Sequence, residues 1–116
     1  MHEVSLVRSI FRTLEEEFPA DKIDRLVQVN LRVGLLSNVE PVLMQTAFQA
    51  LAEAEVKYRD VVLEIETVPV TIFCASCQLT SEVQHYKFVC ANCGQLNNNV
   101  IQGTELLIHQ VHFSEN

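Results

Sequence analysis

Two pairs of cysteines constrain the fold of this chain more than any other feature of its sequence. Cys74 and Cys77 form one C-x-x-C pair. After twelve intervening residues, Cys90 and Cys93 form a second pair, which Gly94 follows. Each pair places two thiolates about one tight turn apart, which suits two corners of a tetrahedron. Two such pairs complete the four-sulfur shell that Zn²⁺ prefers, so the pattern predicts a structural zinc ion.

Two other uses of these cysteines are alternatives to structural zinc. Iron in a rubredoxin-like site would use the same four sulfurs. A redox dithiol is the second alternative, but a catalytic C-x-x-C motif normally works as a single pair at the N-terminus of a helix. A shell of four cysteines also leaves no open position for a water molecule, so zinc catalysis is not expected.

The sequence around the cysteines needs a metal ion for its stability. Few large apolar residues lie between Pro69 and Gly103, so these roughly 30 residues cannot bury a core of their own. Structural zinc contributes on the order of 10–16 kcal/mol of apparent binding free energy, which would offset the weak core. Residues 83–89 are expected to form a strand that leads into the second cysteine pair.

The first half of the chain contains two patterns typical of helices. Apolar residues at helical spacing predict a helix over residues 4–18, which Pro19 ends. Pro41 suits the first turn of a second helix, which extends to about residue 55. The two apolar faces comprise Val4, Val7, Ile10, Phe11, Leu14 and Phe18 in the first helix, and Leu43, Ala47, Phe48, Leu51 and Ala52 in the second.

Three segments are typical of strands. Residues 24–33 alternate between apolar and polar side chains, and the apolar face comprises Val27, Val29, Leu31 and Val33. A second segment alternates in the same way through Val61, Leu63 and Ile65. Residues 104–113 form a last strand with less regular alternation, as expected for a strand that is central or covered on both faces.

The order of these elements predicts the fold. A strand, a helix and a second strand in succession form a βαβ unit with parallel strands and a right-handed crossover. The predicted fold is of the α+β class: a small three-stranded mixed sheet carries two helices, and a zinc-ribbon-like module is inserted before the last strand. The expected sheet domain comprises residues 1–69 together with 104–116, and the zinc-binding module comprises residues 70–103.

Charge and hydropathy exclude several functions. Eight Lys and Arg residues against fifteen Asp and Glu residues give a net charge of −7, which argues against a nucleic-acid partner because phosphate binding needs clustered cations. Residues 1–18 carry several charges, so neither a signal peptide nor a membrane-spanning helix is expected there. We therefore expect a cytoplasmic protein without membrane insertion, whose cysteines are metal ligands rather than disulfides.

The first three residues, Met1, His2 and Glu3, bring a free amine, backbone amides and an imidazole together. Removal of an initiating methionine normally requires a small second residue, so Met1 is expected to remain with a free amine. That amine titrates at about pH 8, where a metal can displace its proton. Chelation through the amine, the amide nitrogen and the imidazole of His2 suits Ni(II) or Cu(II). On spacing alone this signal is weak, because a histidine at position two often arises by chance and a terminal residue that binds nothing accounts for it.

Three segments, in order along the chain, resemble one protein family. They are MHEVSLVRSI at the start, VGLLSNVEP at residues 33–41, and the paired C-x-x-C motifs followed by GTELLIHQVHF. Together they are similar to the HypA/HybF hydrogenase nickel-incorporation proteins over essentially the whole chain. The resemblance implies a mixed three-stranded sheet with two helices and an attached zinc module, in agreement with the fold predicted from the patterns.

The resemblance also implies a function, that of a nickel metallochaperone rather than an enzyme. By analogy, His2 is the essential ligand of the transported Ni(II), Met1 supplies its amine, and Glu3 binds or tunes the metal. The family works with the HypB GTPase and delivers nickel to the large subunit of [NiFe]-hydrogenase, and some members serve urease maturation. The residues that correspond to the Zn(II) ligands are Cys74, Cys77, Cys90 and Cys93.

This sequence departs from many relatives at three positions. Leu35 stands where many carry a glutamate, and Gln78 and Gly94 stand where some carry a histidine after the C-x-x-C pair. A coupling of zinc ligation to nickel binding through such histidines therefore does not follow from the resemblance.

The other histidines are expected to be surface residues. His85 lies in the module, and His109 and His112 lie three residues apart on the last strand, where they face opposite sides and cannot easily form one chelate. No nucleophile–base pair or phosphate-cradling glycine loop is apparent in the sequence. The alternatives to a nickel chaperone are a zinc-ribbon protein-interaction module without metal delivery and a zinc-dependent nucleic-acid binder, against which the net charge argues.

Overall fold

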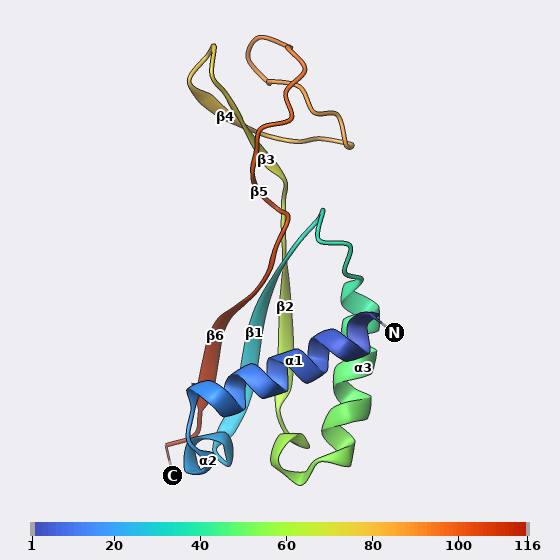
Figure 1. Cartoon of the computed structure of the whole chain (residues 1–116), viewed down its shortest axis with the longest axis vertical. Helices are drawn as coiled ribbons and strands as arrows, with labels where there is room; N and C mark the ends of the chain where they lie inside the picture. Colours follow the sequence, from blue (N-terminus) through green and yellow to red (C-terminus); the bar gives the residue numbers. More distant parts are fainter. Residues whose placement is uncertain (1, 116) are drawn as a thin grey trace.

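The computed structural model describes residues 2–115, without the side chain of His2, and measures 53 × 29 × 18 Å (Figure 1). Two three-stranded sheets lie end to end along its long axis. We call residues 2–69 together with 104–115 the body, and residues 70–103 the module. The shape is therefore that of a helix-bearing body with a smaller module at one end.

The sheet of the body is mixed. β1 (Leu26–Gly34) lies between β2 (Val62–Val68) and β6 (Leu106–Phe113). It pairs parallel with β2 and antiparallel with β6. α3 (Pro41–Ala54) and the short 3-10 helix η1 (Val56–Tyr58) connect β1 to β2. The predicted fold class, a small mixed sheet with an inserted four-cysteine module, is confirmed.

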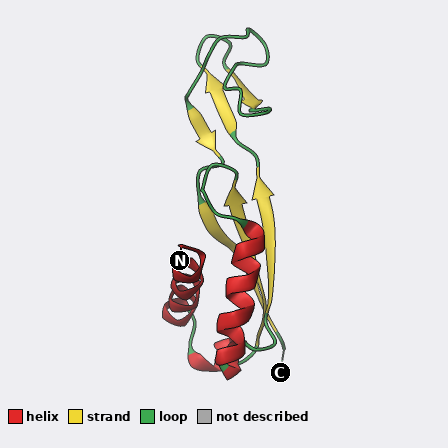
Figure 2. Ribbon diagram, turned by 90° about the vertical axis from the view of Figure 1, so that its right-hand side faces the viewer, coloured by secondary structure: helices red, strands yellow, loops and turns green. Residues whose placement is uncertain are grey.

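The helices cover one face of the body sheet. α1 (His2–Glu17) and α3 lie on the same side of the strands, while α2 (Ala20–Ile23) turns the chain into β1 (Figure 2). α1 can cover the sheet because its apolar residues recur every three or four positions. Among the described residues, no helix is both long and apolar enough to cross a membrane. The buried core includes Val7, Phe11, Leu14, Val29, Leu31, Met44, Phe48, Tyr58 and Leu63.

The prediction of burial is wrong for two residues of the expected core. Val27 is 43% exposed and Leu26 is buried in its place, because the pairing of β1 with β6 shifts register between Leu26 and Gln28. Leu43 is 52% exposed, whereas Met44 is completely buried. Met44 precedes the buried residues Ala47 and Phe48 by three and four positions, which is the spacing of one helical face.

Residues 83–89 do not form the predicted strand. β4 (Leu79–Glu82) ends before them, and the chain turns between Gln84 and Lys87, which form an isolated bridge. His85 and Tyr86, between those two residues, have φ angles of 52° and 59°. Positive φ is incompatible with a β-strand, so the turn ends the strand early.

The module has its own antiparallel sheet, which the sequence patterns did not predict. β3 (Thr71–Cys74) lies between β4 and β5 (Val100–Gln102). Asn97 holds the polar run before β5 in place, because its Nδ2 donates to the carbonyl of Phe73 at 2.7 Å and its Oδ1 accepts from the Asn99 amide at 2.7 Å. The residues buried in the module include Val70, Ile72, Ser81, Cys74 and Cys90.

Body and module join where two glycines approach each other. A Cβ atom on Gly34, at the end of β1, would lie 2.2 Å from both the carbonyl carbon and the oxygen of Gly103. The contact is fixed by two hydrogen bonds: the Gly34 amide donates to Glu105 at 2.9 Å, and the Leu36 amide donates to Gly103 at 2.8 Å. Gly103 itself has a φ of +107°, a conformation that side chains rarely allow.

A hydrogen bond between Tyr58 and Glu15 joins η1 to α1. The Tyr58 hydroxyl donates to Glu15 at 2.6 Å, and the Lys57 ammonium lies 3.1 Å from the same carboxylate oxygen. The Tyr58 ring is buried and stacks on Phe11 with 4.0 Å between ring centroids. The bond from Tyr58, followed by that from Lys57, lowers the pKa of Glu15.

We predict that Tyr58→Phe lowers the free energy of unfolding by about 1 kcal/mol at neutral pH, because it removes this bond while keeping the ring. The carboxylate gains its partners only in the folded state. Its contribution is therefore complete above the ordinary carboxyl pKa and is lost as pH falls through the lowered folded value. Urea unfolding of both proteins at neutral and acidic pH tests this: the difference should shrink in acid. An equal difference at both pH values would contradict the assignment.

Candidate metal centres

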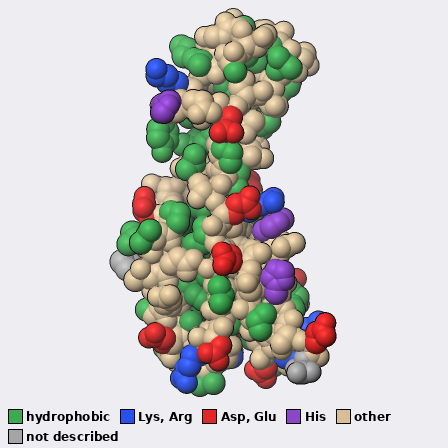
Figure 3. All heavy atoms as spheres, turned by 180° about the vertical axis from the view of Figure 1, so that it is seen from behind, with side chains coloured by type: hydrophobic (Ala, Val, Ile, Leu, Met, Phe, Trp, Pro, Cys, Tyr) green, Lys and Arg blue, Asp and Glu red, His purple; other side chains and the backbone are tan. Residues whose placement is uncertain are grey.

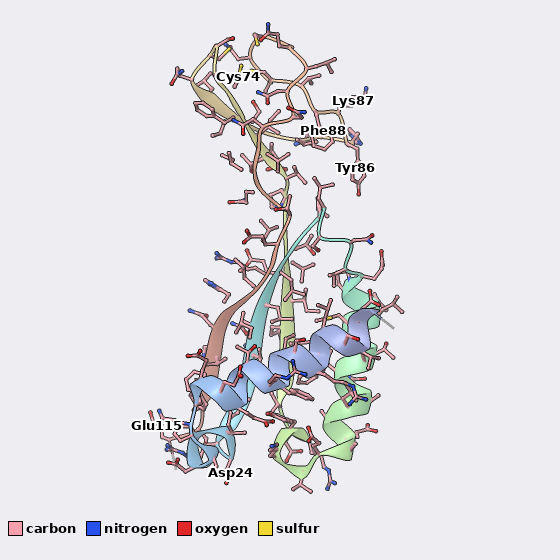
Figure 4. All side chains as sticks on the ribbon, viewed as in Figure 1. Asp24, Cys74, Tyr86, Lys87, Phe88 and Glu115 are labelled. Atoms are coloured by element: carbon pink, nitrogen blue, oxygen red, sulfur yellow. The ribbon has the colours of Figure 1, made fainter. Side chains whose placement is uncertain are left out.

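The four cysteines of the module meet at one point. Cys74 comes from the end of β3, Cys77 follows in the turn, and Cys90 and Cys93 come from the second turn. Their sulfurs all lie within 4.8 Å of one another, and the Cys74–Cys93 and Cys77–Cys90 pairs are each 3.9 Å apart. Figure 4 shows Cys74 near the outer end of the module. The cluster is thus assembled from two turns that β3 and its neighbours hold together.

The two turns have the same backbone geometry. The residue after each second cysteine has a positive φ, 59° at Gln78 and 75° at Gly94. Its amide donates to the carbonyl of the first cysteine of the pair, from Gln78 to Cys74 at 2.8 Å and from Gly94 to Cys90 at 2.9 Å. Gln78 adopts this conformation without being glycine, and its side-chain amide donates to Ala75 at 2.7 Å. Both turns therefore direct their two sulfurs inward.

Neighbouring polar groups hold the sulfurs in position. The Asn92 side-chain amide lies 3.3 Å from the Cys77 sulfur and donates to it. The Ser81 hydroxyl, which is buried, accepts the Ala91 amide at 3.0 Å and so connects β4 to the second turn. Groups that orient and bond to ligands in this way tune a metal centre. The sequence patterns did not reveal either residue, because both depend on contacts between segments.

The pKa values of two of the cysteines, Cys90 and Cys93, are shifted in opposite directions. The backbone amides of Cys93 and Asn92 donate to the Cys90 sulfur and lower its pKa to about 6. The Gln95 amide lowers the pKa of Cys93, but hydrogen bonding with the Cys77 thiol and burial outweigh it and raise the pKa to about 11. Thiols this close compete to ionise, because several thiolates repel one another unless a cation lies between them.

This donor set fits a tetrahedral metal ion. Zn–S bonds of about 2.3 Å place the sulfurs of a tetrahedral site roughly 3.8 Å apart, close to the spacing found here. Four thiolates match the preference of Zn²⁺, and they would also accept iron. The structure therefore contains a four-cysteine group able to hold a metal ion of this kind.

The structure describes only part of the predicted nickel site. Met1 and the side chain of His2 lie outside the described residues. α1 begins at His2, beside the start of α3 (Figure 1). Glu3 lies in the first turn of α1, and its carboxylate accepts the amide of Glu40 at 3.4 Å. Glu40, which the sequence analysis did not single out, precedes α3 and thus lies close to the amino terminus.

The remaining histidines are all exposed. His85 lies in the turn between Gln84 and Lys87, and His109 and His112 lie on β6. Nε2 of His112 is 3.5 Å from Nδ2 of Asn30 on the face of the sheet away from the helices. Among the described residues, the four cysteines are the only group of three or more His, Cys, Asp or Glu side chains that could hold a metal ion.

Comparison with known proteins places the chain in a family. Residues 1–113 match the family model described as "Hydrogenase/urease nickel incorporation, metallochaperone, hypA". The chain is 34% identical to a hydrogenase maturation factor HypA from Desulfitobacterium hafniense, over 99% of this chain and all of that protein. It is 30% identical to a hydrogenase maturation factor HypA from Shewanella baltica, over the whole of this chain and 98% of that protein.

Solved structures of similar proteins share the fold. The Ni metallochaperone HypA from Helicobacter pylori superimposes with a TM-score of 0.66 at 23% identity, over 96% of each chain. A second solution structure, of HypA protein, gives a TM-score of 0.72 at 24% identity over 100% of this chain and 98% of the other. The family match over nearly the whole sequence and the shared fold lead to one conclusion: this chain belongs to the HypA family of hydrogenase and urease nickel-incorporation metallochaperones.

Proposed function

We propose that this protein binds Ni(II) at its amino terminus and delivers it during maturation of [NiFe]-hydrogenase. The observation that carries the proposal is that α1 begins at His2. The first amides of a helix have no carbonyl partner within it, so the amide of His2 is free of the helical hydrogen bonding that would compete with a metal. The Met1 amine, the His2 amide and the His2 imidazole then form successive chelate rings around nickel.

Charge near the terminus supports a bound cation. The N-terminal end of a helix carries a partial positive charge, which by itself opposes a cation. Glu3 in the first turn offsets it, and Glu40 lies next to Glu3 because its amide donates to the Glu3 carboxylate. The same partial positive charge would favour loss of the proton from the His2 amide on metal binding, because it stabilises the negatively charged nitrogen. We therefore assign Glu3 the role of binding or tuning the nickel.

The two metal centres have separate tasks in this proposal. Cys74, Cys77, Cys90 and Cys93 hold Zn(II), which stabilises the module. Nickel at the chain terminus has nitrogen donors that can be exchanged one at a time, as a delivery protein requires. Protons compete for the amine and the imidazole, so nickel affinity should fall as pH falls through the range in which these groups titrate.

Family membership supports a proposal for the maturation partners. We propose that the protein works in the cytoplasm with the HypB GTPase and hands nickel to the large subunit of [NiFe]-hydrogenase. Urease maturation is the alternative client, since the family description includes both enzymes. We assign the protein no catalytic residue.

The decisive experiment is nickel titration of the wild type and of His2→Ala, with zinc quantified in both. We expect His2→Ala to weaken nickel binding by about 100-fold or more, or about 2.7 kcal/mol, because an anchoring nitrogen is lost. His109→Ala serves as a matched control, because it removes an exposed histidine of the body. Zinc content should be the same in all three proteins. Unchanged nickel affinity in His2→Ala would overturn the terminal site.

A version of the protein with one extra residue before Met1 tests the amine separately. The added residue keeps the imidazole but moves the free amine away from it, so the chelate rings are broken. Nickel affinity should fall while zinc content remains unchanged. Normal nickel uptake by this variant would count against the amine as a ligand. If neither variant binds nickel differently, the zinc-ribbon interaction module without metal delivery becomes the better description.

A further inference from the structure

A strained hairpin turn projects from one side of the module (Figure 4). Gln84 and Lys87 face each other, and the Lys87 amide donates to the Gln84 carbonyl at 2.9 Å. The two residues between them, His85 and Tyr86, both have positive φ. This is the backbone of a type I′ turn, in which asparagine and glycine are favoured because other side chains adopt positive φ only at a cost in free energy.

The strain is not repaid by packing within the chain. His85 is exposed and Tyr86 is 69% exposed, so neither side chain gains much burial from the turn. Non-glycine residues in such conformations cluster at functional sites, where the side chain serves a purpose other than folding. The side chains at this turn are therefore candidates for an outward-facing role.

Further apolar side chains surround the turn. Leu96 is 87% exposed, and the Val89–Leu96 bridge and the hydrogen bond from the Asn97 amide to Phe88 bring Leu96 beside Phe88. A hollow of about 410 Å³ opens there, lined by Phe88, Leu96, Asn97 and Asn98. Figure 4 shows Tyr86, Lys87 and Phe88 together on one side of the module, away from Cys74. We call Tyr86, Lys87, Phe88 and Leu96 the tip surface.

Charge sets this region apart from the body. Residues 70–103 contain one of the eight cations and one of the fifteen acids of the chain, so with neutral cysteines the rest of the chain carries the entire formal charge of −7. A zinc ion held by four thiolates would add a charge of −2 at the cysteine turns, away from Tyr86. The single acid, Glu82, accepts the side-chain amide of Gln84 at 3.4 Å. The single cation, Lys87, lies in the tip surface beside His85. In Figure 3 the body displays many charged side chains, whereas the module is mostly uncharged.

We propose that the tip surface docks a different protein, whose surface offers an apolar pocket bordered by carboxylates. Tyr86 and Leu96 would enter the pocket, since exposed aromatic and large apolar side chains in uncharged surroundings are typical binding anchors. Lys87 would meet the carboxylates. An acidic protein would be repelled by the body, but not by the tip.

A second copy of this chain fits the tip less well. Two tips that meet about a two-fold axis would bring two Lys87 side chains together without an acid between them. If the tip docks on the acidic body of the next copy, the contact is head-to-tail. Such contacts generate open-ended chains of molecules unless the rotation between successive copies closes them into a ring. The inference rests on the maturation partners of the proposed function, but it does not depend on where nickel binds.

The test uses the two proteins named under the proposed function, the HypB GTPase and the precursor of the hydrogenase large subunit from the same organism. Each is titrated with the zinc-loaded wild type and with Tyr86→Ser, Leu96→Ser and Lys87→Glu. We expect each variant to weaken binding to the same one of the two proteins by about tenfold or more. Val56→Ser is the matched control, because Val56 is 79% exposed on the body. It should bind like the wild type.

A double variant, His85→Asn with Tyr86→Gly, separates docking from folding. It gives the turn the sequence that a type I′ turn favours, so it should retain zinc at least as firmly as the wild type while losing the anchor. Weakened partner binding with intact zinc supports the proposal. The proposal is overturned by wild-type binding of the double variant, by absence of binding of the wild type to both proteins, or by a change in self-association alone. Nickel titration of the same samples reports separately on the terminal site.

Discussion

Cys90→Ser is expected to release zinc and unfold the module while the body remains folded. Cys90 is almost completely buried, and its sulfur is within 3.9 Å of the Cys77 sulfur at the centre of the cluster. Structural zinc contributes on the order of 10–16 kcal/mol of apparent free energy, far more than the few buried residues of the module can replace. The body has its own hydrophobic core, so its fold does not depend on the zinc ion.

Zinc quantification, chymotrypsin digestion and amide NMR spectra check this expectation together. Cleavage at Tyr86 and Phe88 should become rapid in Cys90→Ser, and the NMR changes should be confined to residues 70–103, which also tests the predicted domain limits. Ser76→Ala is the control, since Ser76 is an exposed residue of the first cysteine turn. Retention of one zinc ion per chain by Cys90→Ser, with unchanged resistance to protease, would refute the assigned ligand set.

Gly34→Ala is expected to be the most disruptive change outside the cluster. Its Cβ would lie 2.2 Å from two backbone atoms of Gly103, so one of the two connections between body and module must move. Backbone cannot yield as a flexible side chain does, and we expect a loss of at least about 3 kcal/mol of unfolding free energy. The hydrogen bonds from Gly34 to Glu105 and from Leu36 to Gly103 should weaken with it.

Gly94→Ala provides the contrast. A Cβ there meets nothing within 4 Å, although φ is +75°. The cost should be about 1 kcal/mol, from the backbone conformation alone. Guanidinium chloride unfolding of the two zinc-loaded variants beside the wild type measures the difference. Similar midpoints for the two variants would show that Gly34 can move away from Gly103 at little cost in free energy.

The sequence predicted most of the body because its elements are long and periodic, but β6 is an edge strand and not the central or doubly covered strand that its pattern suggested. Val29, Leu31 and Val33 alternate over a full strand, so their burial follows from local pattern alone. The error at Val27 arose because a register shift against β6 reverses which side chain faces the core, and no local pattern encodes it. The module sheet was missed because β3 and β5 have only four and three residues, too few to show a period.

In the candidate sites too, some residues follow from local sequence and others only from contacts between segments. Cysteine spacing is a local signal, and it led directly to the cluster that the structure assembles. Asn92, Ser81 and Glu40 act through contacts with other segments, so their part in the sites needed coordinates. The strain at His85 and Tyr86 is likewise visible only as a pair of backbone angles.

The position of the module between β2 and β6 affects the order in which the chain can fold. β6 must return to β1 across the whole module, and a long flexible loop makes such a pairing slow because its ends seldom meet. Val70 lies against Gly103, so the folded module brings the start of β6 back beside the end of β2. A zinc ion that keeps the module folded would therefore speed the pairing of β6 with β1 during folding.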